Sequence, residues 1–307
     1  MKNEDYHIPV LLHAATDALI NDRDGVYVDV TFGGGGHSRE LLNLISEGRL
    51  IALDQDADAF ANSISDDRFL LLRQNFRNIQ NVLMSIGVEK VDGILADLGV
   101  SSHQFDELER GFSFRYDAIL DMRMNQDAEL RAIDVVNDYS QEKLSQLFIR
   151  YGEFRKGEAR KIVNRIFEER KKHSIDTTGK LADCVGGLIS EKYKNQFLAR
   201  VFQSIRIEVN RELNVLEEFL LQIPNILKPN GVISVITYHS LEDRLVKNFF
   251  RTGDLDGILN KDIYGVVSRP LDPINRKPII PSQEEIVQNP RARSAKLRMA
   301  KSNNIIE

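Results

Sequence analysis

The sequence predicts an α/β fold with a mostly parallel sheet and an inserted all-helical domain. In the first hundred residues, and again before residue 240, short apolar runs alternate with helical patterns of polar and apolar residues. Alternation of this kind places consecutive strands in parallel, with helices covering both faces of the sheet. Between about 125 and 200 the pattern changes to helices alone.

Five strands are expected, each a short apolar run rich in β-branched residues. A glycine-rich loop and a helix follow the first strand, and a single long helix through Ile205 and Leu220 precedes the last. Residues 253–281 are rich in glycine, proline and aspartate, which predicts a loop with one short strand. The expected strands are Val26–Val30, Leu50–Leu53, Phe69–Leu72, a strand centred on Gly93–Leu95, and Gly231–Thr237.

Three helices are expected in the middle of the chain. Ser140 is placed to cap the first, the second carries Ile162 and Ile166 on one face, and the third begins at Thr177 or Thr178. We therefore divide the chain into a discontinuous domain, residues 1–108 and 201–307, and a helical insert, residues 109–200. The insert is the expected substrate-recognition domain.

Composition favours a protein of the cytoplasm. The apolar runs are short and broken by polar residues, which excludes a transmembrane helix, and residues 1–10 lack the blocks of a secretory signal. The single cysteine, Cys184, excludes an internal disulfide and a metal site with two thiolate ligands. Because Cys184 shares helical spacing with Leu181 and Val185, we expect it in the core.

Charge is unevenly distributed along the chain. The net charge of −5 argues against a nucleic-acid partner, but residues 150–172 carry nine basic and four acidic residues, and residues 289–301 carry five basic residues and no acidic ones. Residues 1–60, in contrast, carry eleven acidic and four basic residues. This distribution suits a protein that holds a cationic small molecule in one part and a polyanion in another. Solvent-exposed helix and tail surface is the alternative.

A glycine-rich loop, Gly33–Gly36, lies between the first strand and the first helix. Its glycines let the backbone approach a ligand closely, and amides at the start of the helix can bind a polar or anionic group. A P-loop is excluded because no Gly-Lys-Ser/Thr follows. A dinucleotide loop is disfavoured because Ser38 stands where the third glycine is expected.

Acidic residues follow two of the strands. Asp54 lies 21 residues after Gly33, where a carboxylate can accept the hydrogen bonds of a ribose diol, and Asp97 ends the fourth strand. A pocket lined by carboxylates suits the sulfonium and ammonium groups of S-adenosylmethionine better than a pyrophosphate. Phe76 is placed to pack on the adenine. For each residue taken singly, a role in a turn or in the core is the alternative.

Eight blocks of the sequence resemble a known family, the small-subunit ribosomal RNA (cytosine-N4)-methyltransferases, or MraW family. The resemblance covers nearly the whole chain, and the blocks that begin at Asp97 and Tyr238 are the most specific. The matching blocks are His7–Leu12, Asp29–Ser38, Asp97–Ser102, Glu109–Phe114, Leu120–Met124, Phe202–Leu213, Tyr238–Arg244 and Asn289–Ser294.

The resemblance implies a class I, Rossmann-like, S-adenosylmethionine-dependent methyltransferase fold. It also implies methylation of N4 of a specific cytidine in the decoding region of 16S ribosomal RNA. The implied partner is this RNA within the assembled 30S particle, and a homodimer stays open. By motif position, the implied cofactor contacts are Gly34, Gly35, Gly36, His37, Asp54, Phe76, Asp97 and Gln104.

The expected reaction puts demands on the site. The cytosine amino group is a poor nucleophile, so it must be aligned with the methyl–sulfur bond and given a proton acceptor. The Asp/Asn-Pro-Pro-aromatic turn of many amino-methyltransferases is absent after the fourth strand, and backbone carbonyl groups near Leu98 are candidates instead. Methylation at carbon 5 would need a cysteine nucleophile, which Cys184 is badly placed to supply. The leaving sulfur is already cationic, so no metal is expected.

The segment Tyr238–Arg244 follows the fifth strand at the end of the sheet where open α/β proteins bind ligands. Tyr238 is expected to border the target base, His239 and Ser240 to donate or accept hydrogen bonds with it, and Arg244 to contact a phosphate. The alternative is structural: Ser240 caps the next helix and Asp243 completes a capping box.

RNA contacts are expected from three further places. Arg206 and Asn210 share one polar face of the long helix with Gln203, and Asn210 is expected to contact the base. Solvent exposure is the alternative for this face. Asp121 and Arg123 could pair with each other or contact RNA. The expected phosphate contacts are Arg206, Arg244, Arg160, Lys161, Arg165, Arg170, Lys171, Lys172, Arg291, Arg293, Lys296 and Arg298.

Two other functions share part of this pattern. An NAD(P)-dependent Rossmann oxidoreductase would have the same sheet, glycine loop and acid after the second strand. An RNA-binding ribosome-assembly factor without catalysis would use the basic segments alone.

Overall fold

The computed structural model describes residues 9–261, 265 and 267–303, so His7 and Ile8 of the first motif block lie outside the described residues. The chain divides into two compact units. One, which we call the sheet unit, comprises the chain up to Gly99 and from Leu213 onward, and the other, the helical unit, comprises Val100–Glu212. The sequence had placed these divisions at 108/109 and 200/201.

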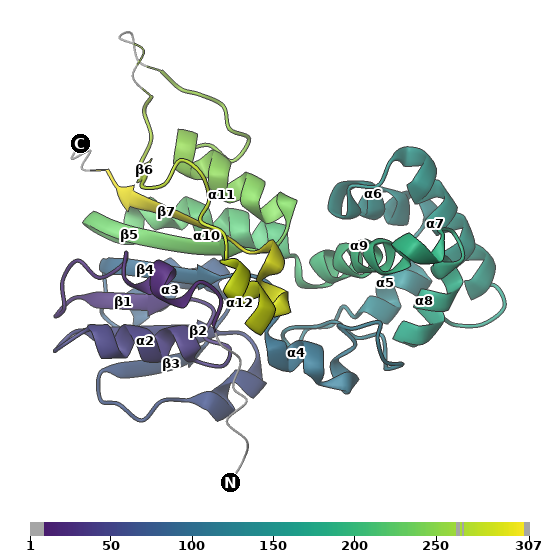
Figure 1. Ribbon diagram of the computed structural model, residues 1–307, viewed down its shortest axis with the longest axis horizontal. Coiled ribbons are helices and arrows are strands. Elements are labelled where there is room, and N and C mark those ends of the chain that lie inside the picture. Colours follow the sequence, from purple (N-terminus) through teal and green to yellow (C-terminus); the bar gives the residue numbers. More distant parts are fainter. Residues whose placement is uncertain (1–8, 262–264, 266, 304–307) are drawn as a thin grey trace. The chain divides into compact units, whose positions relative to one another are not determined.

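A seven-stranded sheet forms the centre of the sheet unit, in the order β3-β2-β1-β4-β5-β7-β6 (Figure 1). The first five strands pair in parallel, whereas β7 pairs antiparallel with β5 and with β6. The mostly parallel sheet is therefore confirmed. The strands are β1 Val26–Asp29, β2 Arg49–Asp54, β3 Phe69–Arg73, β4 Val91–Asp97, β5 Leu227–Thr237, β6 Leu271–Pro273 and β7 Lys296–Ser302.

Strand β7 was not expected, because its residues were assigned to a basic tail. Leu297, Met299 and Ala300 are buried, and Lys301 is exposed. The partial alternation of apolar and basic residues in this segment is a strand signal that its charge obscured.

Successive strand residues point to opposite faces of the sheet, and each face has its own core. Val28, Ile51 and Ile94 lie in one cluster, and their neighbours Tyr27 and Leu50 lie in the other. The first cluster includes residues of α3 Ile79–Ser85, α10 Glu212–Ile226 and α11 Ser240–Thr252. The second includes residues of α1 Leu12–Thr16 and α2 Gly36–Leu44. Helices therefore cover both faces, as the alternation predicted.

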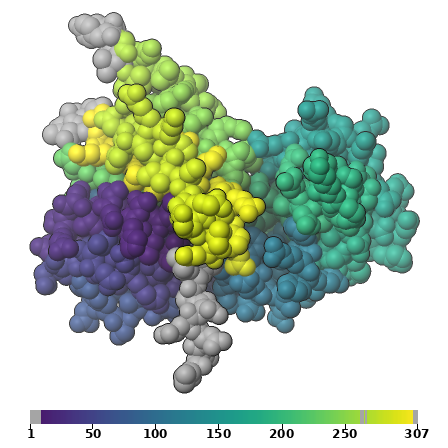
Figure 2. Space-filling view, in the orientation of Figure 1, coloured from purple at the N-terminus to yellow at the C-terminus, as the bar shows by residue number. Residues whose placement is uncertain are grey.

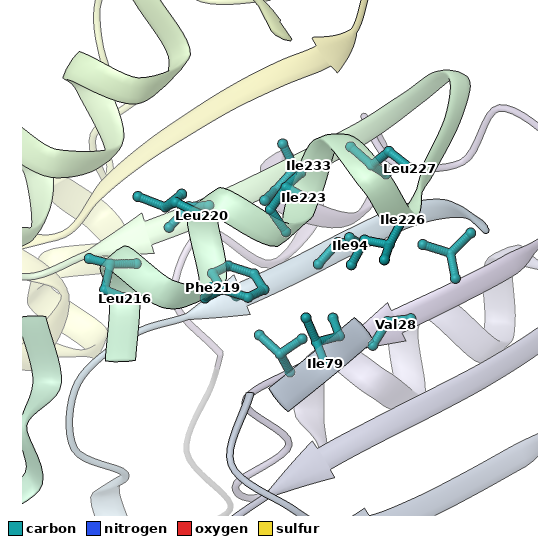
Figure 3. Packing of buried hydrophobic residues seen from close by; sticks show 14 of the residues in the cluster. Val28, Ile79, Ile94, Leu216, Phe219, Leu220, Ile223, Ile226, Leu227 and Ile233 are labelled. Carbon is teal, nitrogen blue, oxygen red and sulfur yellow. The ribbon is translucent and has the colours of Figure 1, made fainter. Parts of the chain in front are cut away.

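Helix α10 contributes more buried residues to the first cluster than α3 or α11 does. Its residues Leu216, Phe219, Leu220 and Ile223 are spaced at three and four, so they share one face. Figure 3 shows this face directed at the strands, with Phe219 and Ile223 near Ile94. Phe219 is fully buried.

The expected single helix through Ile205 and Leu220 is wrong. Helix α9 ends at Asn210, Arg211 takes a left-handed conformation with φ 51°, and α10 begins at Glu212. A non-glycine residue in this conformation costs roughly 1 kcal/mol and ends a helix. The apolar periodicity continues across the break, which is why it concealed the boundary.

The helical unit contains α4 Ser102–Asp106, α5 Ala132–Asp138, α6 Gln141–Gly152, α7 Lys156–Arg170, α8 Thr178–Gly186 and α9 Glu191–Asn210 (Figure 1). The predicted caps are confirmed, since Ser140 accepts a hydrogen bond from Lys143 N and Thr177 accepts one from Lys180 N. Cys184 is buried, as expected, and burial raises the pKa of its thiol to about 11. Among the described helices, none combines the length and apolar character that a bilayer requires.

We predict that Phe219→Ala lowers the free energy of unfolding by about 3–5 kcal/mol, because it leaves a cavity between α10 and the sheet. Leu221→Ala on the same helix is the matched control. Its side chain is 56% exposed, so the loss should stay within about 0.5 kcal/mol. Urea denaturation followed by circular dichroism measures both, and equal losses would contradict the assigned helix face.

Candidate functional site

The carboxyl ends of the parallel strands bring three aspartates to one edge of the sheet. Asp29 ends β1, Asp54 ends β2 and Asp97 ends β4. Strand β1 lies between β2 and β4, and the strand order reverses direction between β1 and β4. In open α/β sheets, ligands bind at this switch point, outside the carboxyl ends of the strands.

The glycine loop forms an open helix start at this edge. Gly35 is the N-cap of α2 with φ 75°, and no side chain caps the helix there. A Cβ on Gly36 would collide with the ring of Pro9, so only glycine fits against this neighbour. The carbonyl of Gly34 accepts a hydrogen bond of 2.7 Å from Arg39 Nη1. The loop therefore presents backbone amides rather than a side-chain cap, which suits a polar or anionic group.

Asp29 ties the loop to the sheet. It is 1% exposed, and its Oδ2 accepts a hydrogen bond of 2.6 Å from Ser38 Oγ in the first turn of α2. Its Oδ1 accepts one of 3.1 Å from Thr31 N. Thr31 Oγ1 in turn accepts a hydrogen bond of 2.6 Å from Asp97 N. Burial raises the pKa of Asp29, against the lowering effect of these hydrogen bonds.

Both carboxylate oxygens of Asp54 accept hydrogen bonds from backbone amides. Oδ2 accepts a hydrogen bond of 2.8 Å from Gly33 N, and Oδ1 accepts one of 2.8 Å from Asp56 N. Burial raises the pKa of Asp54 to about 6, although these two backbone donors act to lower it. Each oxygen keeps a second lone pair, so the carboxylate can still accept hydrogen bonds from a ligand.

Asp97 lies between His37 and Tyr238. Tyr238 Oη donates a hydrogen bond of 2.8 Å to Asp97 Oδ1, and His37 Nδ1 lies 3.8 Å from Oδ2. His37 Nε2 lies 3.0 Å from the carbonyl oxygen of Val10, which assigns the proton of the neutral ring to Nε2. Burial, followed by the charge of Asp97, raises the pKa of Tyr238 well above its ordinary value. The ring of Tyr238 also packs against Gly99, where a Cβ would lie 3.4 Å from it.

The turn from β5 into α11 is capped by His239 and not by Ser240. Glu242 Oε2 accepts hydrogen bonds from Tyr238 N at 2.9 Å and His239 N at 3.3 Å, and His239 Nδ1 accepts one from Glu242 N at 3.4 Å. His239 Nε2 lies 3.2 Å from Glu242 Oε1 without hydrogen-bond geometry among the described residues. The alternative with Ser240 as N-cap and Asp243 in the box is therefore wrong by one residue.

Asp243 instead anchors strand β7. Arg298 Nε donates a hydrogen bond of 2.6 Å to it, and Lys296 Nζ lies 3.3 Å away. Burial acts to raise the pKa of Asp243, but the two cations hold it below its ordinary value. Arg298 is only 8% exposed. Its expected phosphate contact is therefore wrong, because this guanidinium is buried in an ion pair.

Two residues of α9, Asn210 and Arg206, have hydrogen-bond or ion-pair partners within the helical unit. Asn210 Nδ2 donates to the carbonyl groups of Met122 at 2.8 Å and Arg206 at 2.9 Å, and its Oδ1 accepts from Met124 N at 2.7 Å. Asn210 thus holds the 122–124 segment through Met122 and Met124 and binds its own helix through Arg206. Arg206 makes a two-pronged ion pair with Glu212 at 2.8 and 2.9 Å. These contacts show structural roles for both residues, and their expected RNA contacts stay predictions.

The basic helix α7 divides into structural and exposed cations. Arg170 donates to the carbonyl groups of Val136 and Tyr139 and stacks on Phe167, so it stabilises the fold. Lys171 and Lys172 lie within ion-pair distance of Glu168 and Glu169. Arg165 is exposed, with Nε donating to the carbonyl of Cys184. The other expected RNA contacts that are exposed are Lys171, Lys172, Arg160, Lys161, Arg244, Arg291 and Arg293.

The remaining predicted residues have structural contacts that leave their predicted roles untested. Phe76 packs edge-on against Phe219 at 5.2 Å and is partly buried. Gln104 belongs to the helical unit and forms a capping box with Ser101. Asp121 and Arg123 form an ion pair of 2.7 Å, which is the first of the two alternatives left open for them.

Sequence reasoning missed the supporting roles of three residues. Thr31 and Ser38 carry the hydrogen bonds that join Asp29 to Asp97 and to α2, and Glu242 holds the turn after β5. Of these, only Glu242 could have been found from the sequence, since it stands three residues after the N-cap, where a capping box has its glutamate.

Comparisons with known proteins identify the family of this chain. The model of the MraW methylase family matches residues 4–303. The ribosomal RNA small subunit methyltransferase H of Christiangramia forsetii is 52% identical over 97% of this chain and 98% of its own length. Its counterpart in Bacteroides fragilis is 48% identical over 98% of this chain and 99% of its own.

Two solved structures also align with the chain, each at 10% identity and a TM-score of 0.44. One is an rRNA methylase from Streptococcus thermophilus, which aligns over 97% of this chain and 100% of its own. The other is a putative methyltransferase from Streptococcus mutans in complex with SAH, which aligns over 96% and 99%. Because the family model covers nearly the whole chain and the sequence relatives share about half of its residues, this chain belongs to the MraW methylase family.

Proposed function

We propose that this protein transfers a methyl group from S-adenosylmethionine to N4 of a specific cytidine in the decoding region of small-subunit ribosomal RNA. Family membership and the relatives named for ribosomal RNA methylation support the class of reaction and substrate. The observation in this chain that carries the proposal is the gathering of Asp29, Asp54 and Asp97 beside an uncapped helix start at the switch point of the sheet.

The residues at this edge fit the functional groups of the cofactor. The bound cofactor supplies an electrophilic methyl group on a cationic sulfur. The uncapped start of α2 suits its carboxylate, and the proposed contacts there are Gly34, Gly35, Gly36 and His37. Asp54 keeps lone pairs for the ribose diol, and Asp97 places negative charge near the cationic end. Phe76, three residues past the end of β3, is the proposed neighbour of the adenine, and Gln104 is the proposed contact from the helical unit.

On the substrate side we assign the wall of the site to Tyr238. Its hydroxyl is fixed by Asp97, and its ring is backed by Gly99, so both its position and its tilt are constrained. A constrained aromatic wall can hold an extruded base with its amino group in line with the methyl–sulfur bond. His239 fixes the turn as the N-cap, and Ser240, exposed in the first turn of α11, faces the RNA. Backbone carbonyl groups near Leu98 are the proposed acceptors for the amino protons.

The proposal also covers the form of the RNA substrate and the residues that contact its phosphates. Arg160, Lys161, Arg165, Arg244, Arg291 and Arg293 are the proposed phosphate contacts. The substrate is proposed to be the RNA within the assembled 30S particle, in the cytoplasm where that particle is built. The net charge of −5 supports a structured particle over naked RNA. A homodimer is compatible with the proposal but is not required by it.

Neither competing function gains support from the site. In a dinucleotide loop the position of Ser38 would be a glycine for close helix packing, whereas here the Ser38 hydroxyl binds Asp29. A non-catalytic assembly factor would not need a switch point lined by fixed carboxylates. Membership of a methylase family also argues against both.

We expect the purified protein to methylate small subunits from a strain that lacks the enzyme, with N4-methylcytidine as the product found by nucleoside analysis. Tyr238→Phe should lower kcat/KM by about 10- to 100-fold, because it removes the hydroxyl donor to Asp97. Leu221→Ala, on an exposed helix face, serves as the control. A different methylated nucleoside, or no transfer by the wild type, would contradict the proposed function.

We predict that affinity for S-adenosylmethionine falls as the pH drops through about 6, the raised pKa of Asp54. Protonation removes an acceptor for the ribose diol, so Kd should rise by up to about tenfold per pH unit below that point. Asp54→Asn should bind more weakly at pH 8 and lose this dependence. Asp66→Asn is the control, because hydrogen bonds from Arg68 hold the pKa of Asp66 at about 2. Calorimetry from pH 5 to pH 8 measures all three proteins, and an unchanged slope in Asp54→Asn would remove Asp54 from the site.

Charge reversal at Arg160 and Lys161 should weaken RNA binding and flatten its salt dependence. Two lost phosphate contacts should reduce the slope of log K against log salt by about 1.5. Arg23→Glu with Lys90→Glu is the matched control, since both side chains are exposed and both precede strands, at the end of the sheet away from the site. Filter binding at several salt concentrations measures the slopes, and equal slopes for both double variants would exclude α7 from the RNA contact.

A further inference from the structure

A pocket of about 340 Å³ opens beside the turn between β5 and α11, within the sheet unit. Its lining comes from three separate parts of the chain: the turn itself, the segment leading into α12 (Gln283–Gln288), and the end of the 3₁₀ helix Pro290–Ser294 with the start of β7. The residues that matter here are Tyr238, Ser240, Ile280, Ile286, Arg293 and Lys296.

The chemistry of the lining combines an aliphatic wall with cations. Ile280, Pro281 and Ile286 supply the wall, and Ile280 is 66% exposed, although it is a large apolar side chain. Arg293, which is exposed, also lines the pocket, and Ser240 and Ser294 add hydroxyl groups. No carboxylate lines the pocket among the described residues. An apolar wall beside cations and hydroxyls fits a nucleotide, whose flat base is apolar on its faces and whose phosphate is anionic.

The size of the pocket limits its occupant. A volume of about 340 Å³ lies at the lower end of the range for small-ligand sites, roughly 300–1,000 Å³. This is room for one nucleotide and not for a base pair. An unpaired RNA strand, whose bases can be splayed apart and held singly, is the substrate class that matches.

The pocket shares a wall with the proposed methylation site. Tyr238 lines the pocket, and the same side chain donates its hydroxyl hydrogen to Asp97 at 2.8 Å. A base held on the Asp97 side of Tyr238 would therefore have its chain neighbour within reach of the pocket. Because the two sites meet at one side chain, they can take consecutive nucleotides of one strand.

The wall is held in place by contacts that do not involve a ligand. Glu285 of α12 accepts a hydrogen bond of 2.7 Å from Leu11 N, and Ser282 caps the helix. Ile279 exchanges backbone hydrogen bonds of 3.0 and 2.8 Å with Leu297 of β7. Figure 2 shows the described part of this C-terminal segment, in yellow, against the N-terminal part of the sheet unit, in purple. The pocket is therefore preformed, which reduces the entropy cost of holding a nucleotide in it.

We propose that this pocket binds the nucleotide adjoining the target cytidine in the RNA chain, with its base against Ile280 and Ile286 and its phosphate near Arg293. The inference rests on the proposed function, because it assumes an RNA substrate. It assigns sequence or shape selection at a flanking position to the C-terminal segment of the sheet unit.

The first test compares two neighbouring aliphatic residues of α12. Ile286 lines the pocket, whereas Val287 does not and is 71% exposed. With small subunits lacking the methyl group as substrate, Ile286→Ala should raise KM for subunits about tenfold and leave kcat and the Kd for S-adenosylmethionine within about twofold. Val287→Ala should change none of these values. A fall in kcat with unchanged KM, or equal behaviour of the two variants, would overturn the inference.

The second test maps the RNA that reaches the pocket and does not depend on a substitution inside a packed region. Ile280→Cys places a thiol at an exposed position, and the native Cys184 is buried. After attachment of a photoreactive azidophenacyl group and irradiation on the subunit, reverse transcription should stop at the nucleotide next to the target cytidine. Met84→Cys, 63% exposed on α3, is the control and should give no such stop.

The two tests separate this inference from the proposed function. Stops at the target cytidine alone, at distant nucleotides only, or none at all would overturn the pocket assignment while methyl transfer by the wild type stays intact. Absence of methyl transfer by the wild type would instead contradict the proposed function itself.

Discussion

The buried carboxylate of Asp29 is the constraint on which the rest of the site depends. Through Ser38 it fixes the first turn of α2, and through Thr31 it fixes the end of β4. These contacts join the glycine loop, the helix start and the strand that carries Asp97 into one rigid unit. Without them the loop would be free to move relative to Asp97, and an alignment of reacting groups could not be kept to within an ångström.

This arrangement places charge where it is costly. Burial raises the pKa of both Asp29 and Asp54, because a carboxylate out of water loses hydration that only hydrogen bonds can replace. For each of these groups, stability therefore increases as the pH falls through the raised pKa toward the ordinary range, so the ionised site works against folding near neutral pH. A cationic ligand bound at this site would stabilise the ionised carboxylates, because it brings positive charge close to them. The Tyr238 hydroxyl also stabilises an ionised carboxylate, because it donates a hydrogen bond to Asp97.

Much of the fold could be predicted because its signals are local. The β-branched runs, the acids at the strand ends and the caps at Ser140 and Thr177 each follow from a few consecutive residues. The helix break at Arg211 could not be predicted, because arginine has no preference for the left-handed backbone conformation that it takes there. The apolar pattern also runs across it without interruption.

The candidate site, like the fold, could be predicted only where the signal in the sequence is local. The acids and glycines were found from their order along the strands. The role of Arg298 was misjudged, and the partners of Asn210 and Arg206 were not foreseen, because a polar residue on a helix or tail looks alike whether it faces solvent, RNA or a buried partner. Such partners lie up to 88 residues away, as for Asn210 and Met122. The cap at His239 was displaced by one residue because histidine is an uncommon cap and the adjacent serine a common one.

The chain passes between its two compact units only twice, after Gly99 and after Glu212. The first passage follows directly on β4, and the second leads directly into α10, so the intervening segment interrupts no strand pairing. Evolution can therefore lengthen, shorten or reshape that segment while the ancestral sheet and its aspartates stay unaltered.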